Sequence, residues 1–211
     1  MKHQCRNLPV QKRTRTTPFF SAGFTVVETL MAVAVLLLAI TAPMTLAERS
    51  LASADAARRE VTAFYLAQEG MEFIRNYKDS NALQTGGRSW LNGLAECAGT
   101  PGGTNKANEQ RGCGIDTTEN AARNIETCSD VRNNDCAIYQ NTNRGDIDLY
   151  GLFGMDRSSS DWVVTDYTRR IFVDEITRNK EARITAIVTW NEGVGARNVR
   201  VDSTIFNWYW K

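Results

Sequence analysis

The residues Gly23-Phe24-Thr25-Val26-Val27-Glu28 begin an apolar run that continues to Ala47. As a helix, residues 24–47 would be about 36 Å long, enough to cross a hydrocarbon layer of about 30 Å. Apolar side chains occupy all sides of such a helix, as contact with lipid or with a packed bundle requires. The run therefore predicts one membrane-spanning helix, and Pro43 within it predicts a kink or an unwound turn.

A basic segment precedes this run. Residues 1–23 contain five basic side chains and no Asp or Glu, namely Lys2, Arg6, Lys12, Arg13 and Arg15. Segments with this charge pattern are held on the cytoplasmic side of a membrane. The following domain is accordingly expected outside the cytoplasm.

Glu28 is the anomalous residue of the apolar run. A carboxylate near the centre of a membrane helix costs about 2.5–3.5 kcal/mol, and such residues are by default functional and paired. No basic residue lies between Phe24 and Glu48, so the span itself offers no cation. One interpretation is that Glu28 reaches the cytoplasmic interface. Another is that cleavage after Gly23 creates an amino-terminal cation on Phe24, in a zone of low dielectric constant where an ion pair is strong.

Together, the basic leader, the Gly23–Phe24 junction and Glu28 resemble the processing signal of type IV pilins and of type II secretion pseudopilins. The resemblance implies that prepilin peptidase cleaves after Gly23 and methylates the new terminus at Phe24. It also implies that Glu28 of an incoming subunit meets the terminal amine of a neighbour during assembly. Val26 and Val27 stand where many members carry Leu or Ile, a change that leaves this chemistry intact.

Two other interpretations of the amino-terminal region are open. Thr45-Leu46-Ala47 is an acceptable cleavage site for an ordinary secretory signal, and an uncleaved membrane anchor would have the same apolar run. The pilin-type interpretation is favoured because the run exceeds the usual apolar region of 7–15 residues and begins with a carboxylate.

The cysteines predict disulfides. Cys5 lies in the leader, and the remainder keeps four cysteines, an even number that suggests two disulfides in an oxidising compartment. Three pairings are possible, and reduced thiols remain an alternative. We prefer sequential pairing because it closes the shortest loops. A zinc site is less expected, because no two of these cysteines have the short spacing typical of one. The candidate residues are Cys97, Cys113, Cys128 and Cys136.

Composition predicts a protein without catalytic activity. The only histidine, His3, also lies in the leader, so the remainder has none for a catalytic triad, a general base or a metal site. The leader contains five of the 25 basic side chains and none of the 24 acidic ones, so the remainder has 20 basic and 24 acidic side chains. This balance argues against a dedicated nucleic-acid surface, so DNA is not an expected partner.

The pattern after the span predicts an α+β fold. An amphipathic helix is expected over residues 48–81, with a core-facing stripe of Leu51, Ala54, Ala57, Val61, Phe64, Met71 and Ile74. Gly70 would permit close packing there. An antiparallel sheet is expected over 162–211, with strands at 167–174, 182–190 and 198–208, a possible strand at 162–164 and a turn at 191–195. The helix stripe would cover the apolar face of this sheet.

Residues 82–161 are rich in Gly, Asn and Cys and are expected to be variable loops, with short helices possible over Arg88–Cys97 and Glu119–Cys128. Two Asn/Asp groups there could supply oxygen ligands to calcium. Turn formation explains them more simply, so no cofactor is expected. The two groups are Asp130, Asn133, Asn134 and Asp135, and Asn141, Asn143, Asp146 and Asp148.

The segment Tyr65–Glu72 and the final hairpin with Trp190 resemble the I/V subclass of minor pilins and pseudopilins, which implies a pilin-like arrangement of helix and sheet. The expected function is that of a non-catalytic, membrane-stored minor subunit. It would join or prime a type IV pilus-like or type II secretion filament. The alternative is a binding module at a filament tip that uses the loops at 82–161 for adhesion, DNA uptake or contact with a secretion substrate. The implied partners are prepilin peptidase, other subunits, the lipid bilayer and, indirectly, an inner-membrane platform protein and an assembly ATPase.

Overall fold

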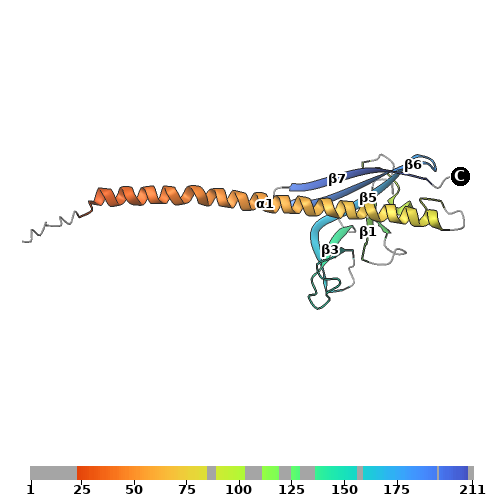
Figure 1. The fold of residues 1–211 in the computed structure, drawn as a ribbon, viewed down its shortest axis with the longest axis horizontal. Helices are drawn as coiled ribbons and strands as arrows, with labels where there is room; N and C mark the ends of the chain where they lie inside the picture. The colour runs from red at the N-terminus through yellow and green to blue at the C-terminus, as the bar shows by residue number, and fades with distance from the viewer. Residues whose placement is uncertain are drawn as a thin grey trace, which may run out of the picture. The chain divides into compact units, whose positions relative to one another are not determined.

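The computed structural model describes residues 23–84, 89–102, 111–118, 125–128, 136–155, 159–193 and 195–208. The chain forms two compact units, one ending at Ser50 and one beginning at Leu51. The elements, shown in Figure 1, are α1 (Val26–Leu83), the 3-10 turn η1 (Ala95–Cys97), β1 (Cys113–Ile115), β2 (Ile125–Thr127), β3 (Ala137–Asn141), β4 (Phe153–Gly154), β5 (Trp162–Thr177), β6 (Glu181–Glu192) and β7 (Gly195–Phe206).

In the first unit, α1 is long and apolar enough to cross a membrane. Two hydroxyls within it are bonded to the helix backbone: Thr29 Oγ1 donates to the carbonyl of Val26 (2.8 Å), and Thr41 Oγ1 donates to that of Leu37 (3.0 Å). Such internal bonds satisfy polar groups where no water is present. The helix continues through Pro43 without the unwound turn that was one of the two expectations for this residue.

In the second unit, α1 buries a stripe that begins later than expected. Its buried apolar residues recur along one face of the helix: Ala63, Leu66, Ala67, Met71 and Ile74. Leu51, Val61 and Phe64, which were expected to face the core, are exposed. The stripe prediction was therefore wrong for residues 51–64, because apolar character alone does not show where the sheet begins to cover a helix.

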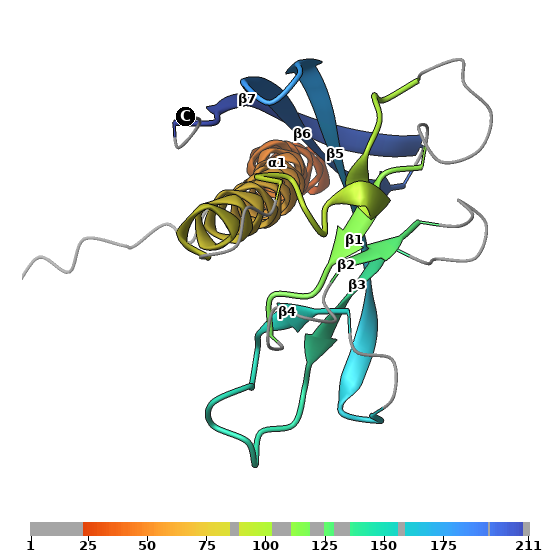
Figure 2. The same cartoon turned by 90° about the vertical axis from the view of Figure 1, so that its right-hand side faces the viewer.

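The sheet is antiparallel and has β5 at its centre. β5 pairs with β6 along one side and with β1 and β3 along the other, while β7 pairs with β6. Figure 2, which looks along α1, shows β5, β6 and β7 curving past the helix. The strands expected at 162–164 and 167–174 form a single strand, β5, and β6 and β7 meet at the expected turn.

Residues 82–161 contribute to the sheet, although they were expected to be loops. β1 pairs with β2 and β5, and β3 pairs with β4 and β5. The helix expected over Glu119–Cys128 is wrong at 125–127, which form β2, and the one expected over Arg88–Cys97 is reduced to η1. These short strands are specified by partners far away in the sequence, which local propensity does not reveal.

One hydrophobic core joins helix and sheet. The helix stripe packs with Ile171 and Val173 of β5 and with Ile184, Ala186 and Val188 of β6. All four described cysteines belong to the same cluster. The α+β arrangement of one long helix and an antiparallel sheet is thereby confirmed.

Candidate functional site

The expected cleavage site lies immediately before the helix. Gly23, Phe24 and Thr25 are exposed and precede α1, with Phe24 78% exposed. The backbone N–H of Thr29 donates to the carbonyl of Thr25 (3.1 Å), and the N–H of Glu28 donates to Thr25 Oγ1 (3.3 Å). Thr25 is thus the N-cap of α1. The Gly23–Phe24 peptide bond consequently lies outside the helix, on an accessible backbone.

Glu28 lies in the first turn of α1, is exposed, and makes no ion pair with any described residue. It stands three residues after the N-cap threonine, the spacing of a capping box, and a carboxylate there also interacts favourably with the helix dipole. Sequence analysis missed this local role, although the signal Thr25-x-x-Glu28 was visible. The position of the carboxylate in the first turn therefore favours the helix start through the helix dipole.

The first unit exposes a long apolar surface. Every large apolar side chain of α1 between residues 26 and 46 is more than half exposed. A monomeric soluble protein rarely shows so large a patch, and such patches mark membrane or protein contacts. These residues are Val26, Val27, Leu30, Met31, Val33, Val35, Leu36, Leu37, Leu38, Ile40, Met44 and Leu46.

The four candidate cysteines form two buried disulfides, Cys97–Cys113 and Cys128–Cys136. This is the sequential pairing preferred from loop length. The first joins η1 to β1, and the second begins directly after β2. Gly114 lies between them, where an added Cβ would come within 2.9 Å of Cys136 Sγ. Both cross-links thus pack against β1.

The oxygen atoms proposed for calcium are used in turns. Asn141 Oδ1 accepts from the N–H of Asn143, and Asn143 Oδ1 accepts from that of Gly145, both at 2.9 Å. Asp146 Oδ1 accepts from the N–H groups of Asp148 and Leu149. Within the described ranges, no group of three His, Cys, Asp or Glu side chains is placed to hold a metal. The other candidate group, 130–135, and the leader residues His3 and Cys5 lie outside the described residues.

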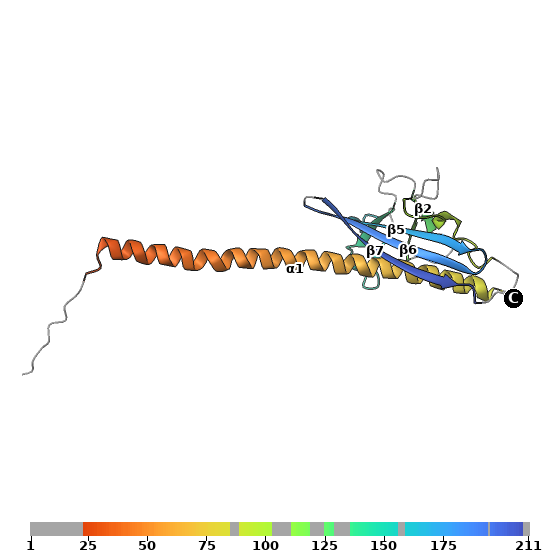
Figure 3. The same cartoon turned by 90° about the horizontal axis from the view of Figure 1, so that it is seen from above.

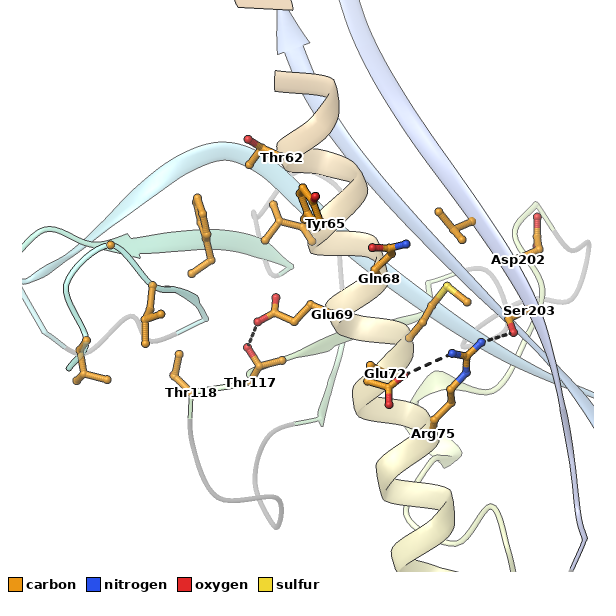
Figure 4. A pocket seen from close by; sticks show the side chains of 17 residues that line it. Thr62, Tyr65, Gln68, Glu69, Glu72, Arg75, Thr117, Thr118, Asp202 and Ser203 are labelled. Atoms are coloured by element: carbon orange, nitrogen blue, oxygen red, sulfur yellow. Dashed lines mark hydrogen bonds and ion pairs between the residues drawn. The ribbon is translucent and has the colours of Figure 1, made fainter. Parts of the chain in front are cut away.

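The second unit contains a groove of about 1140 Å³ along the exposed side of α1. Its helix residues include Thr62, Tyr65, Gln68, Glu72 and Arg75. Figure 4 shows Thr117 and Thr118 on one side of the helix and Asp202 and Ser203 of β7 on the other. Leu149 and residues 151–153 also line the groove. Sequence analysis did not find this groove, because its walls come from segments distant in the sequence.

A buried arginine fixes the base of one groove wall. Arg169 of β5 is 1% exposed, and its Nη1 donates to the carbonyl of Leu66 (2.9 Å) and to Glu69 Oε2 (2.7 Å). Its Nη2 donates to the carbonyl of Ile115 (2.6 Å). The other carboxylate oxygen of Glu69 accepts from Thr117 Oγ1 (2.7 Å). One guanidinium thus connects α1, β1 and β5.

Two carboxylates of the second unit, Asp202 and Asp79, have lowered pKa values. A hydrogen bond from Arg200 lowers the pKa of Asp202, and Thr185 Oγ1 adds a bond of 2.6 Å. A hydrogen bond from Lys78 lowers the pKa of Asp79. Both groups are ionised at neutral pH and serve as hydrogen-bond acceptors, which fits a structural role for them.

Comparison of the chain with protein-family models, with curated proteins and with solved structures finds no match.

Proposed function

We propose that this chain is a non-catalytic, membrane-stored filament subunit of the type IV pilin and pseudopilin class. Its leader would be removed after Gly23 by prepilin peptidase, and the new terminus at Phe24 would be methylated. The domain from Leu51 onward would lie outside the cytoplasm, in the periplasm or on a cell-surface filament. The single observation that carries the proposal is Glu28, an exposed carboxylate one helical turn after an accessible Gly23–Phe24 bond.

The proposed assembly contact follows from charge and burial. When the apolar surface of α1 is covered by lipid or by neighbouring helices, Glu28 needs a cation, and no basic side chain lies nearby on its own span. The amine of Phe24 on a neighbouring subunit would supply this cation. Covering the apolar surface would also exclude water, which strengthens the ion pair. The chemical modification of the subunit would thus be confined to its new amino terminus.

The amino-terminal residue and mass of the exported protein test the processing step. Edman degradation and mass spectrometry are expected to give methylated Phe24. Replacing Gly23 with a bulkier residue, as in Gly23→Leu, should leave the leader attached. A chain that begins at Glu48 would overturn the proposal, since it would identify an ordinary secretory signal.

Glu28→Gln tests whether assembly needs the charge of Glu28. Glutamine also serves at this position of a capping box, so the helix start should be kept while the charge is lost. We expect normal cleavage and membrane insertion but strongly reduced incorporation into filaments, measured by immunoblotting of sheared filament fractions. Unchanged incorporation would contradict the proposed assembly role of the carboxylate.

A binding function at a filament tip is the second candidate, and the groove favours it. Part of its lining, namely Thr117, Thr118, Leu149 and residues 151–153, belongs to the region proposed for binding. Deleting 82–161 would remove β1, β3 and both disulfides, so it would destroy the domain. Shortening only the exposed segment 144–148 is the better test: lost adhesion with intact filaments would support the binding role, and unchanged adhesion would argue against it.

A further inference from the structure

The loop between β3 and β4 carries two opposite charges that are separated by a single glycine. Residues 144–146 have the sequence Arg-Gly-Asp, and Ile147 and Asp148 follow them. Figure 2 shows this loop, drawn in teal, pointing away from α1 and from β6 and β7. Figure 3 shows that β6 and β7 lie along the part of α1 that belongs to the same unit. The tripeptide is therefore presented on a projecting part of the second unit.

Residues 143–146, the Arg-Gly-Asp turn, are held in place by hydrogen bonds. The N–H of Asp146 donates to the carbonyl of Asn143 (3.2 Å), and the N–H of Gly145 donates to Asn143 Oδ1 (2.9 Å). Asn143 Nδ2 in turn donates to Asp161 Oδ2 (3.0 Å), which connects the turn to the start of β5. An added Cβ at Gly145 would lie only 3.1 Å from Asn143 Oδ1. A turn that is fixed in this way loses less conformational entropy when it binds a partner.

Both charges of the turn are available to a partner. Arg144 is exposed, and it forms no ion pair with any residue that the structure describes. Asp146 Oδ1 accepts from the N–H groups of Asp148 and Leu149, whereas no described group donates to Oδ2. The turn therefore presents one guanidinium and one free carboxylate oxygen to the solvent.

An apolar pair lies beside this carboxylate. Ile147 is 89% exposed and Tyr150 is 49% exposed. The N–H of Tyr150 donates to the carbonyl of Asp146 (2.9 Å), which closes one helical turn. Residues three apart on such a turn are neighbours on one side of it. Ile147 and Tyr150 would thus add apolar contact area next to the charged groups.

We propose that the Arg-Gly-Asp turn binds a receptor protein whose pocket contains a divalent cation and a carboxylate. The Cα atoms of Arg144 and Asp146 are at most about 7 Å apart, so one pocket can contact both residues. The guanidinium would form a bidentate pair with the receptor carboxylate. The free oxygen of Asp146 would fill one coordination position of Mg²⁺ or Mn²⁺, which prefer oxygen ligands. A receptor arginine would fit this aspartate less well, because a bidentate pair uses both carboxylate oxygens.

This inference rests on the binding function, the second candidate, and gives it a class of partner. It does not need the chain to join a filament. The pocket that it requires is the kind found in integrins, the metal-dependent adhesion receptors of animal cells, which therefore supply the probe.

Binding of the full chain to purified receptors tests the proposal. The whole protein in lipid nanodiscs is immobilised and exposed to soluble integrin ectodomains that bind Arg-Gly-Asp peptides, with Mn²⁺ present. We expect saturable binding that is abolished by EDTA. A free Arg-Gly-Asp peptide should compete, whereas an Arg-Gly-Glu peptide, whose carboxylate is displaced by one methylene, should not.

Matched substitutions identify the groups responsible. Asp146→Asn keeps an oxygen that can accept the N–H groups of the loop, but it removes the charge, and we expect at least about tenfold weaker binding. Asp148→Asn makes the same charge change two residues away and should bind normally. Arg144→Gln should also bind at least about tenfold more weakly. Its control is Arg178→Gln, at an exposed position in the turn between β5 and β6. Because Arg144 makes no ion pair with the described residues, this variant keeps the test valid if Asp146→Asn alters the loop.

Three results would overturn the proposal: no saturable binding to any of the ectodomains, binding that survives EDTA, or equal binding by Asp146→Asn and Asp148→Asn. Shortening the segment 144–148 tests the binding function separately. If that shortening abolishes adhesion while Asp146→Asn and Arg144→Gln adhere normally, the loop binds a partner of different chemistry. The binding function would then stand, and the inference about the Arg-Gly-Asp turn would fail alone.

Discussion

Arg169 and Glu69 form an ion pair of 2.7 Å in which the guanidinium is 1% exposed while the carboxylate is 40% exposed. The pair lies where the helix, β1 and β5 meet. A buried guanidinium without its carboxylate is strongly unfavourable, because its charge has been removed from water. The packing of α1 against the sheet therefore depends on a charge as well as on apolar contact.

Glu69→Ala should destabilise the second unit by about 1–3 kcal/mol, because Arg169 loses its counter-charge and Thr117 loses its acceptor. Urea unfolding of the full chain in detergent, followed by the fluorescence of buried Trp90 and Trp190, would measure this. Glu72→Ala is the matched control: it removes an exposed pair with Arg75, and a change of less than about 1 kcal/mol is expected. Equal losses in the two variants would contradict the role of Arg169.

Gly70→Ala should also destabilise the domain. Alanine favours a helix over glycine by about 1 kcal/mol, but the added Cβ would lie 2.4 Å from Ile171 Cδ1 and 3.2 Å from Arg169 Cδ. Overpacking of this kind costs about 1–3 kcal/mol, so steric conflict outweighs propensity. The same urea titration measures it, and Asn76→Ala, at an exposed position of α1, should be neutral or slightly stabilising. A stabilised Gly70→Ala variant would show that the helix can move away from β5.

Removing the disulfides should destabilise the domain to different extents. The Cys97–Cys113 disulfide joins residues 16 positions apart, and the Cys128–Cys136 disulfide joins residues 8 positions apart. Loop-closure entropy predicts losses of about 3 and about 2.5 kcal/mol for the two paired Cys→Ser variants. Thermal unfolding with and without reductant would measure both losses, and reductant should have no further effect once both links are absent. No loss in either variant would mean that the strands hold β1 without cross-links.

Asp202 should give the domain a defined acid sensitivity. Its hydrogen bond with Arg200 lowers its pKa below the ordinary value of 3.8. The carboxylate therefore contributes stability above pH 3.8, and the contribution is lost as the pH falls through the lower, folded pKa. Asp202→Asn should be less stable than wild type at pH 7, by less than about 1 kcal/mol because the pair is exposed. The difference should decrease at pH 2–3, and Asp148→Asn, a control at an exposed loop position, should show no such trend.

The sequence by itself determined the local features of this protein. The apolar run after Gly23 predicted the first part of α1, because an uninterrupted apolar stretch of this length favours a helix. Alternation from Ala182 to Trp190, interrupted at Ile187, predicted β6. The short loops between cysteines favoured the disulfides that form. Each of these features depends on residues close together in the chain.

Only the tertiary structure decided the features that depend on distant partners. The buried stripe of α1 begins at Ala63 and not at Leu51, because burial depends on where the sheet covers the helix. Residues 125–127 form a strand because β1 pairs with them, a choice that their own propensity does not reveal. The buried contacts of Arg169 with α1, and the groove, form only once segments about a hundred residues apart lie side by side. Sequence patterns report local geometry, whereas these sites arise from long-range packing.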